Sequence, residues 1–274
     1  MKANQAHAVI AAGLESPGLI ALWQQEPERL HRCGVDPESF DFDRLQKFAG
    51  LTAKVRHNGL RTDLPLTFRL LNVAGLEIEL FAAYAMFRAT SGNGYADTIA
   101  GREQDLLNFM EGWLDPGRHS HLLLWDVVRY EFALTNLGKM NLGSRASRMT
   151  TSRKTSRAGS VPRVCGAIIL HEMRCDPRTV GAILQEKTPQ LDDVALGTYH
   201  FCYWRKDAGS EVHILQMDEL GYYLLSLADG NTTTAELGRL ISGGSRPAKG
   251  ILTALDQLGD LGIISFAAVR KRGT

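Results

Sequence analysis

Cysteine is scarce in this sequence, and no stretch is long and apolar enough to cross a bilayer. The 274 residues contain four cysteines, and no two of them form a CxxC pair. A disulfide scaffold or a structural zinc site is therefore disfavoured. No apolar run approaches the roughly 20 residues of a membrane-spanning helix, and the N-terminus lacks the ordered features of a signal peptide. We expect a soluble, cytoplasmic protein without a membrane partner.

Catalytic and cofactor-binding motifs are missing as well. The histidines form no HExxH pair, and the glycines form neither a GxxxxGK[ST] nor a GxGxxG phosphate loop. His171, Glu172 and Cys175 lie close together in the sequence, but the spacing supplies no fourth metal ligand. We therefore expect no catalytic residue, no metal ligand and no cofactor in this chain, which would not be an enzyme on its own.

What the sequence does have is the composition of a globular protein, with 44% hydrophobic and 22% charged residues. This composition excludes a collagen-like chain and wholesale disorder. The length exceeds the roughly 100–200 residues of a typical domain, which predicts two domains.

The net charge of +1 conceals an uneven distribution of charged residues along the chain. Residues 1–138 hold 13 basic and 17 acidic side chains, and residues 164–266 hold 8 basic and 13 acidic side chains. The segment between them has basic residues but no acidic ones. Residues 139–163 carry seven basic side chains, no acidic one and many Ser and Thr, so we interpret them as a flexible linker. A basic clamp for an acidic partner is the other interpretation. A short basic tail follows at 267–274.

The first half of the sequence has the periodicity of helices. Ser16 and Asp36 each precede a proline, which is typical of a helix start. Apolar residues recur every three or four positions after Asp41, and a longer apolar stretch at 65–88 is interrupted by Gly75. We expect residues 1–138 to form an all-α bundle of five or six helices that docks on a partner.

A row of polar and aromatic side chains in the last of these helices is a candidate docking surface for that partner. It consists of Trp125, Asp126, Arg129 and Glu131. The alternative is an ordinary solvated helix face, and the sequence alone leaves both interpretations open.

The second half changes to the period of strands. VCGAIIL at 164–170 predicts one strand, and the runs at 198–206 and 211–217, separated by four turn-forming residues, predict a β-hairpin. Three short helices should follow, the third from about 247 to 258, and then a returning strand at 263–266. The chain is thus predicted to be α+β: a helical bundle followed by a winged-helix domain at 164–266.

A winged helix commonly binds DNA, which gives the first function to weigh. The third helix offers only Arg246 and Lys249 near its start and carries Asp256 and Asp260 further along. Residues 195–266 hold 5 basic and 8 acidic side chains, so the positive surface of a DNA reader is missing. A DNA-binding transcriptional regulator remains the alternative function, and nucleic acid is a disfavoured partner.

Peptide capture fits the same layout without requiring positive charge. An extended peptide can add a strand to an open sheet edge. We predict that edge along Glu211, Val212, His213, Ile214 and Leu215, with Val212 and Ile214 on one face of the strand. The third helix would supply an apolar wall, made of Ile251, Leu252, Leu255 and Leu258. Alternatively, some of these residues form the core.

Two sets of residues carry a resemblance to known proteins. The run EVHILQMDELGYYLLSLADGNTTTAELGRLI, with LGIISF after a further helix, resembles the leader-recognition element of ribosomally synthesised, post-translationally modified peptide (RiPP) pathways. This element is a small winged helix related to the pyrroloquinoline-quinone peptide chaperone. LLLWDVVRYEFAL, AIILHEMRCDPRTVGAILQ and YWRKDAGSEVHILQMDE are similar to partner subunits of multinuclear non-haem iron oxygenases, as in methanobactin and 3-thiaglutamate biosynthesis.

The resemblance covers about residues 95–138 and 163–266, and it implies a division of labour. A separate TIM-barrel enzyme would hold the iron and oxidise a cysteine of the precursor peptide. This chain would form a heterodimer with it, bind the leader peptide along Glu211 to Leu215 and against Ile251 to Leu258, and present the cysteine. The long Ser/Arg-rich segment at 139–163 departs from the family pattern, which leaves the placement of the two halves open.

Overall fold

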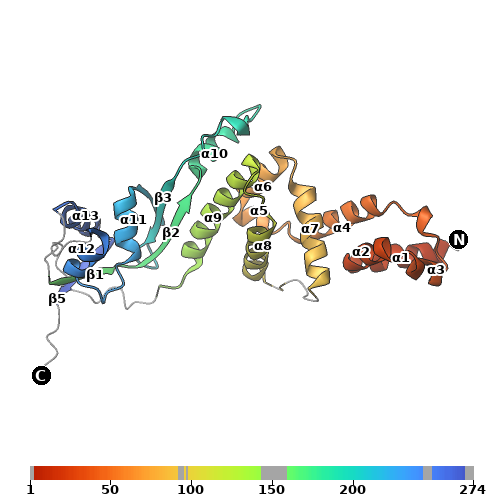
Figure 1. Cartoon of the computed structure of the whole chain (residues 1–274), viewed down its shortest axis with the longest axis horizontal. Helices are drawn as coiled ribbons and strands as arrows, with labels where there is room; N and C mark the ends of the chain where they lie inside the picture. The colour runs from red at the N-terminus through yellow and green to blue at the C-terminus, as the bar shows by residue number, and fades with distance from the viewer. Residues whose placement is uncertain (1–2, 92–95, 97, 143–158, 243–248, 269–274) are drawn as a thin grey trace, which may run out of the picture. The chain divides into compact units, whose positions relative to one another are not determined.

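The computed structural model describes residues 3–91, 96, 98–142, 159–242 and 249–268, and it contains helices together with two small antiparallel sheets (Figure 1). The α+β class predicted from the sequence is confirmed. The chain divides into two compact units. Unit 1 comprises Met1–Phe132 and Pro177–Val194, and unit 2 comprises Ala133–Asp176 and Ala195–Thr274. Each unit is therefore discontinuous in sequence.

The described residues of unit 1 form helices and connecting turns, and none of them belongs to a strand. Its helices are α1 (Ala3–Glu15), α2 (Gly18–Gln25), α3 (Glu28–Arg32), α4 (Phe42–Arg56), α5 (Leu60–Asp63), α6 (Pro65–Val73), α7 (Glu77–Thr90), α8 (Ile99–Trp113), the first part of α9 (His119–Lys139) and α10 (Pro177–Ile183). The sequence predicts fewer helices, because short breaks divide several of the apolar stretches. The stretch at 65–88 is one such case: Gly75, with φ of 69°, separates α6 from α7.

Local signals explain several helix starts in unit 1. The Asp41 side chain accepts a hydrogen bond from the backbone N–H of Arg44 at the start of α4. Thr98 caps α8 in the same way, with its hydroxyl accepting from the N–H of Gly101. Such caps satisfy N–H groups that have no partner inside the helix.

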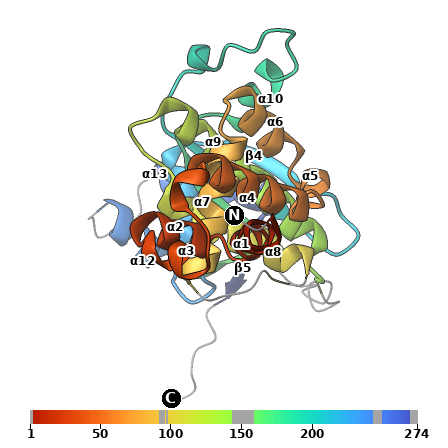
Figure 2. The ribbon, with the colours of Figure 1, turned by 90° about the vertical axis from the view of Figure 1, so that its right-hand side faces the viewer.

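Close helix packing holds the middle of unit 1 together. Gly50 of α4 is buried against α7, and a Cβ atom at this position would lie 2.8 Å from the backbone nitrogen of Ala82. Only glycine permits this approach. The second segment of unit 1, Pro177–Val194, packs on α6. Gly181 of α10 lies beside the Leu66 side chain, and the two helices are neighbours in both views (Figures 1 and 2).

Unit 2 contains both sheets. Its strands are β1 (Ser160–Val164), β2 (Ala167–Met173), β3 (Tyr199–Arg205), β4 (His213–Met217) and β5 (Ile264–Ala268), and its helices after the hairpin are α11 (Glu219–Ser226), α12 (Thr234–Ser242) and α13 (Lys249–Asp260). One antiparallel sheet has the order β2-β3-β4, and β1 pairs with β5 in a separate two-stranded sheet. The predicted hairpin, β3–β4, is confirmed.

The prediction of a single strand at 164–170 is wrong. Gly166 has φ of 89° and ends β1, and a Cβ atom there would lie 2.3 Å from the carbonyl oxygen of Arg205. The chain therefore turns at Gly166 and enters the other sheet as β2. As a consequence, the returning strand β5 pairs with β1 rather than with the hairpin.

The domain boundaries also differ from those expected. The predicted linker at 139–163 ends inside β1, because residues 160–163 pair with β5. Residues 143–158 of that linker, Arg246, and residues 269–274 of the basic tail lie outside the described residues. Helix α9 continues one residue past the predicted end of the bundle at 138 and enters unit 2.

One arginine connects the end of α9 to the hairpin within unit 2. Nη1 of Arg205 donates to the carbonyl oxygens of Leu137, Gly138 and Met140 at 2.6, 2.9 and 3.1 Å. Its Nε donates to the carbonyl of Ser210 in the hairpin loop at 3.0 Å. A cation is favourable at a helix C-terminus, where carbonyl groups lack intrahelical partners.

The helices of unit 2 close a compact apolar core over one face of the three-stranded sheet. The buried members of this core are Cys202, Trp204, Leu224, Leu225, Ala228, Ile251, Leu255, Leu258, Ile263, Ile264 and Phe266. These residues belong to β3, α11, α13 and β5 or directly adjoin them. The hairpin β3–β4 is therefore packed against the helices through this core.

Within the described part of the chain, no single helix has both the length and the apolar character that a bilayer span requires. Helices α6 and α7 meet these criteria only when taken together, and they are bent by 110° relative to each other.

Candidate functional site

The outer side of β4 is an open sheet edge in the described structure. Strand β4 pairs with β3 through Tyr203 opposite Ile214 and Cys202 opposite Leu215, and no other described strand pairs with it. An edge strand presents backbone N–H and C=O groups that can pair with another polypeptide. This edge is where the sequence predicts peptide binding.

The strand begins later than predicted. It runs from His213 to Met217, so Glu211 and Val212 lie in the connection before it. The turn explains this shift. The Asp207 carboxylate accepts from the Gly209 N–H at 3.1 Å and from the Ser210 hydroxyl at 2.9 Å, and these bonds lower the pKa of Asp207. Hairpin pairing then starts at Trp204 opposite His213.

The two faces of β4 have different surroundings. Leu215 and Met217 pack against the apolar core, and the His213 ring lies 5.4 Å from the Trp204 ring on the same side of the strand. Ile214 is half-buried on the opposite face, where its cross-strand neighbour is the buried Tyr203. A peptide strand added to β4 would therefore extend both an aromatic and an apolar surface.

Most of the predicted helical wall belongs to the core instead. Ile251, Leu255 and Leu258 of α13 are 3%, 0% and 5% exposed and are members of the apolar core of unit 2. Leu252 is half-buried. For three of the four wall residues the alternative interpretation is therefore correct, because they occupy the helix face that packs on α11 and β5.

The prediction that Asp126 and Glu131 belong to a docking surface on α9 is wrong, because both carboxylates are buried and have partners inside the protein. Asp126 binds Nη2 of Arg129 at 2.6 Å, and that guanidinium lies 5.2 Å from the centre of the Trp125 ring. Glu131 is 5% exposed, and it accepts hydrogen bonds from the N–H groups of Leu66 and Thr67, both at 2.8 Å. Trp125 and Arg129 are half-buried.

Glu131 thus caps α6 from a helix that lies 64 residues further along the chain. It satisfies two N–H groups that the start of α6 leaves without an intrahelical partner, and it also accepts from the Thr67 hydroxyl at 2.7 Å. Burial raises the pKa of the Glu131 carboxyl, although these hydrogen bonds lower it. The role of this residue is to join α9 to α6.

Cys175, which the sequence places near His171 and Glu172, lies in the interior of unit 2, as does Cys202. No group of three or more His, Cys, Asp or Glu side chains with the geometry of a metal site occurs in the described ranges. Cys175 and Cys202 are fully buried, and burial raises the pKa of the Cys202 thiol to about 12. A thiol in this state is a weak nucleophile.

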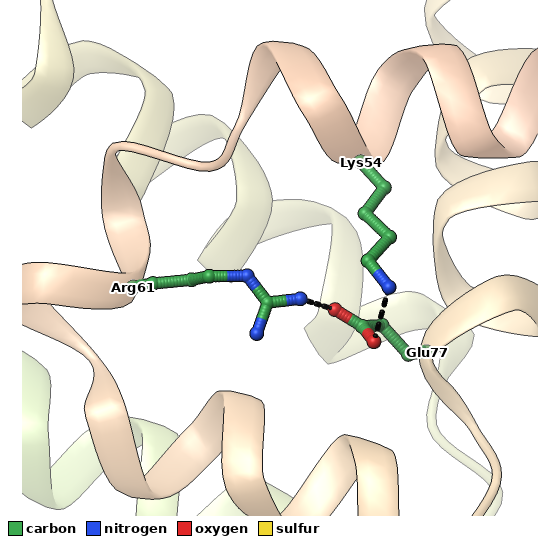
Figure 3. Close-up of polar contacts among 3 residues, drawn as sticks. All are labelled: Lys54, Arg61 and Glu77. Carbon is green, nitrogen blue, oxygen red and sulfur yellow. Dashed lines mark hydrogen bonds and ion pairs between the residues drawn. The ribbon is translucent and has the colours of Figure 1, made fainter.

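The sequence analysis missed a charged cluster in unit 1 (Figure 3). Glu77, at the start of α7, is 5% exposed and forms ion pairs with Lys54 of α4 and Arg61 of α5. The Lys54 Nζ atom lies 2.7 Å from Oε2, and Arg61 Nη2 contacts Oε1. A signal was available: Glu77 is one of only two acidic residues in the apolar stretch at 65–88. A charged residue is rarely fully buried without a partner.

A cavity of about 420 Å³ opens beside this cluster. Its lining contains three cationic side chains, one carboxylate, an amide and an aromatic ring: Lys54, Arg61, Arg69, Glu77, Asn72 and Phe68, together with Pro65. The Arg61 guanidinium lies 4.6 Å from the centre of the Phe68 ring, within the range of a cation–π contact.

Comparison with known proteins found no family model that matches the chain and no match among curated proteins.

Proposed function

We propose that this chain is a non-catalytic subunit that binds the leader of a ribosomally made precursor peptide and presents its cysteine to a separate iron-dependent enzyme. The observation that carries the proposal is the open edge of β4 in the described structure. The resemblance of residues 211–266 to leader-recognition elements supports it. The iron would reside in the partner enzyme, and this chain would supply only binding and positioning.

In this proposal, the leader peptide pairs with β4 as a fourth strand. Its backbone groups would bond to the outer N–H and C=O groups of β4, and its alternate side chains would lie on the two faces of the sheet. On one face they would meet Ile214, and on the other they would meet the side of the strand that carries His213 and Leu215. The helical wall would contribute less than the sequence predicts, because only Leu252 of its four residues is not in the core.

The hairpin β3–β4 with α11, α12, α13 and β5 is, in this proposal, a recognition domain of the winged-helix type. The order of a hairpin, three helices and a returning strand supports this. The pairing of β5 with β1 is a departure from the simplest form of that arrangement. The helices up to residue 138 would form the bundle that docks on the enzyme, with Trp125 and Arg129 as the partly accessible members of the predicted surface.

Backbone pairing can be tested with the peptide rather than with the protein. The probes are fluorescein-labelled synthetic peptides that cover every short open reading frame flanking this gene, and binding to the full chain is measured by anisotropy. N-methylation removes one backbone donor at a time. Because only every second residue of an added strand faces its neighbour, methylation should weaken binding at alternate positions only. Equal effects at successive positions would contradict strand addition.

A protein variant complements this test. Ile214→Asn should weaken leader binding about tenfold or more, an effect of about 1.4 kcal/mol. The matched control is Leu240→Asn, on an α12 side chain that is 68% exposed and lies outside β4. If Ile214→Asn leaves the affinity unchanged, the edge is not the binding surface. Tight binding of duplex DNA that falls steeply with salt, without peptide binding, would favour the transcriptional regulator instead.

A further inference from the structure

The charged cavity of unit 1 lies among four helices, and its lining includes no residue of β4. Lys54 comes from the last turn of α4, Arg61 from α5, Arg69 and Asn72 from α6, and Glu77 from the start of α7. Figure 3 shows Lys54 and Arg61 reaching the Glu77 carboxylate from two different helices. The volume of about 420 Å³ falls within the range of small-molecule sites.

Positive charge exceeds negative charge in this lining. Lys54, Arg61 and Arg69 face a single carboxylate, that of Glu77, which leaves an excess of two positive charges. Arg69 donates from Nη1 to the amide oxygen of Gln185 at 3.1 Å, so this contact does not neutralise its charge. An excess of fixed cations in a concave site attracts an anion.

We propose that this cavity binds a small ligand through a carboxylate or phosphate group. Arg61, Arg69 and Lys54 provide the charge, and the Asn72 amide can donate a further hydrogen bond. The Arg61 and Lys54 side chains are 35% and 28% exposed, so both remain accessible beside the buried Glu77. Two excess charges match the charge of a phosphate monoester or a dicarboxylate.

The arrangement divides into a structural part and a binding part. Glu77 is needed to hold α4, α5 and α7 together, and it requires Lys54 and Arg61 as counter-charges because an unpaired buried carboxylate is costly. Arg69 and Asn72 are exposed and take no part in that ion-pair cluster. These two side chains can therefore be replaced to test binding without disturbing the ion-pair cluster.

The test is calorimetric titration of the full chain with inorganic phosphate and, separately, with succinate, at constant ionic strength set by sodium chloride. Saturable binding of one equivalent of either ion at up to about 10 mM supports the site. The ion that binds with the higher affinity shows whether the site prefers a phosphate or a carboxylate group. No saturable heat with either ion would overturn the proposal.

Matched variants separate a site from general charge attraction. Arg69→Gln should weaken binding about tenfold, and Asn72→Ala should weaken it less. The control is Arg118→Gln, because Arg118 pairs with Glu79 elsewhere in unit 1 and does not line the cavity. If Arg69→Gln and Arg118→Gln change the affinity equally, the ions bind by net charge alone and the proposal fails. The result does not depend on leader binding at β4.

Discussion

The two units enclose different kinds of side chains. Among the described residues, the buried polar or charged side chains of unit 1 are His57, Thr67, Glu77, Glu103, His121, Asp126 and Glu131, whereas those of unit 2 are His200, Thr234 and Ser265. Every carboxylate in this buried set therefore belongs to unit 1. Unit 1 therefore combines an apolar core with buried charges and caps, whereas the described core of unit 2 holds no buried carboxylate.

Backbone chemistry accounts for part of this difference. Each short helix of unit 1 leaves N–H groups at its start and carbonyl groups at its end without partners. Side chains of other helices satisfy some of them, as Glu131 does for α6. In unit 2, strand pairing satisfies much of the backbone directly, so the side chains that face the core can remain apolar. The two units should respond differently to loss of apolar volume, loss of charge and change of pH.

The largest expected effect is loss of volume in the core of unit 2. Leu255 is 0% exposed, and Leu255→Ala should lower the free energy of unfolding by about 2–5 kcal/mol, because it leaves a cavity. Leu240→Ala on α12 is the matched control, since Leu240 is 68% exposed, and it should change stability by about 0.5 kcal/mol or less. Urea unfolding measures both. Similar, small effects would mean that α13 does not pack on the core.

A smaller effect is expected when a buried charge of unit 1 is replaced. Glu131→Gln should lower the free energy of unfolding by about 1.5–3 kcal/mol, because the amide has one acceptor oxygen where the carboxylate has two. The comparison variant is Glu79→Gln, whose side chain is 50% exposed in its pair with Arg118. Exposed pairs contribute about 1 kcal/mol or less. Equal losses in the two variants would contradict the capping role of Glu131.

Local signals in the sequence predicted part of this fold. The Ser16-Pro17 pair marked the start of α2, whereas the Asp36-Pro37 pair begins only a short 3-10 helix at Pro37–Ser39. The β-branched and aromatic runs marked the hairpin β3–β4. These features depend on neighbouring residues, so a pattern within about ten positions suffices to find them. The open edge at Ile214 follows from the hairpin once the sheet order is known.

Features that depend on distant contacts were missed. The sequence periodicity placed Leu255 and Leu258 on one helix face, but it could not show that this face packs on the core. Glu131 was assigned to a solvated or docking face, although a helix start 64 residues earlier covers it. The predicted strand at 164–170 includes Gly166, whose positive φ and close approach to the Arg205 carbonyl cannot be seen in the residue pattern.

The smallest expected effect is on pH dependence, and it should separate the units again. Burial lowers the pKa of His57 and of His121 in unit 1, and nearby arginines act in the same direction. The contacts agree with neutral rings: His121 Nδ1 accepts from the Asp115 N–H at 3.0 Å, and so carries no proton. Because the unfolded chain binds the proton more tightly, stability is present above the ordinary pKa of about 6.5 and is lost as pH falls below it.

Glu131 acts in the opposite direction. Its pKa is raised in the folded chain, so its contribution favours the folded state at low pH and is lost as pH rises through that pKa. Wild type should therefore lose stability between about pH 7 and pH 5, with a slope below about 1.4 kcal/mol per pH unit for each histidine. Where the pH lies below the raised folded pKa of Glu131, Glu131→Gln should make this decline steeper, since it removes the opposing carboxyl.

His57→Asn separates the histidine contribution, because asparagine retains a donor for the Ala53 carbonyl that His57 Nδ1 contacts at 2.8 Å. It should flatten the decline of stability with falling pH, whereas His31→Asn, at an exposed position of α3, should leave that decline unchanged.

The measurement follows unit 1 through its tryptophans. Three of the four tryptophans lie in unit 1, so the fluorescence of a variant that also carries Trp204→Phe reports on that unit. The same slope in His57→Asn and in the parent chain would show that the buried imidazole does not control acid stability, and the contrast between the units would then rest on the carboxylates alone.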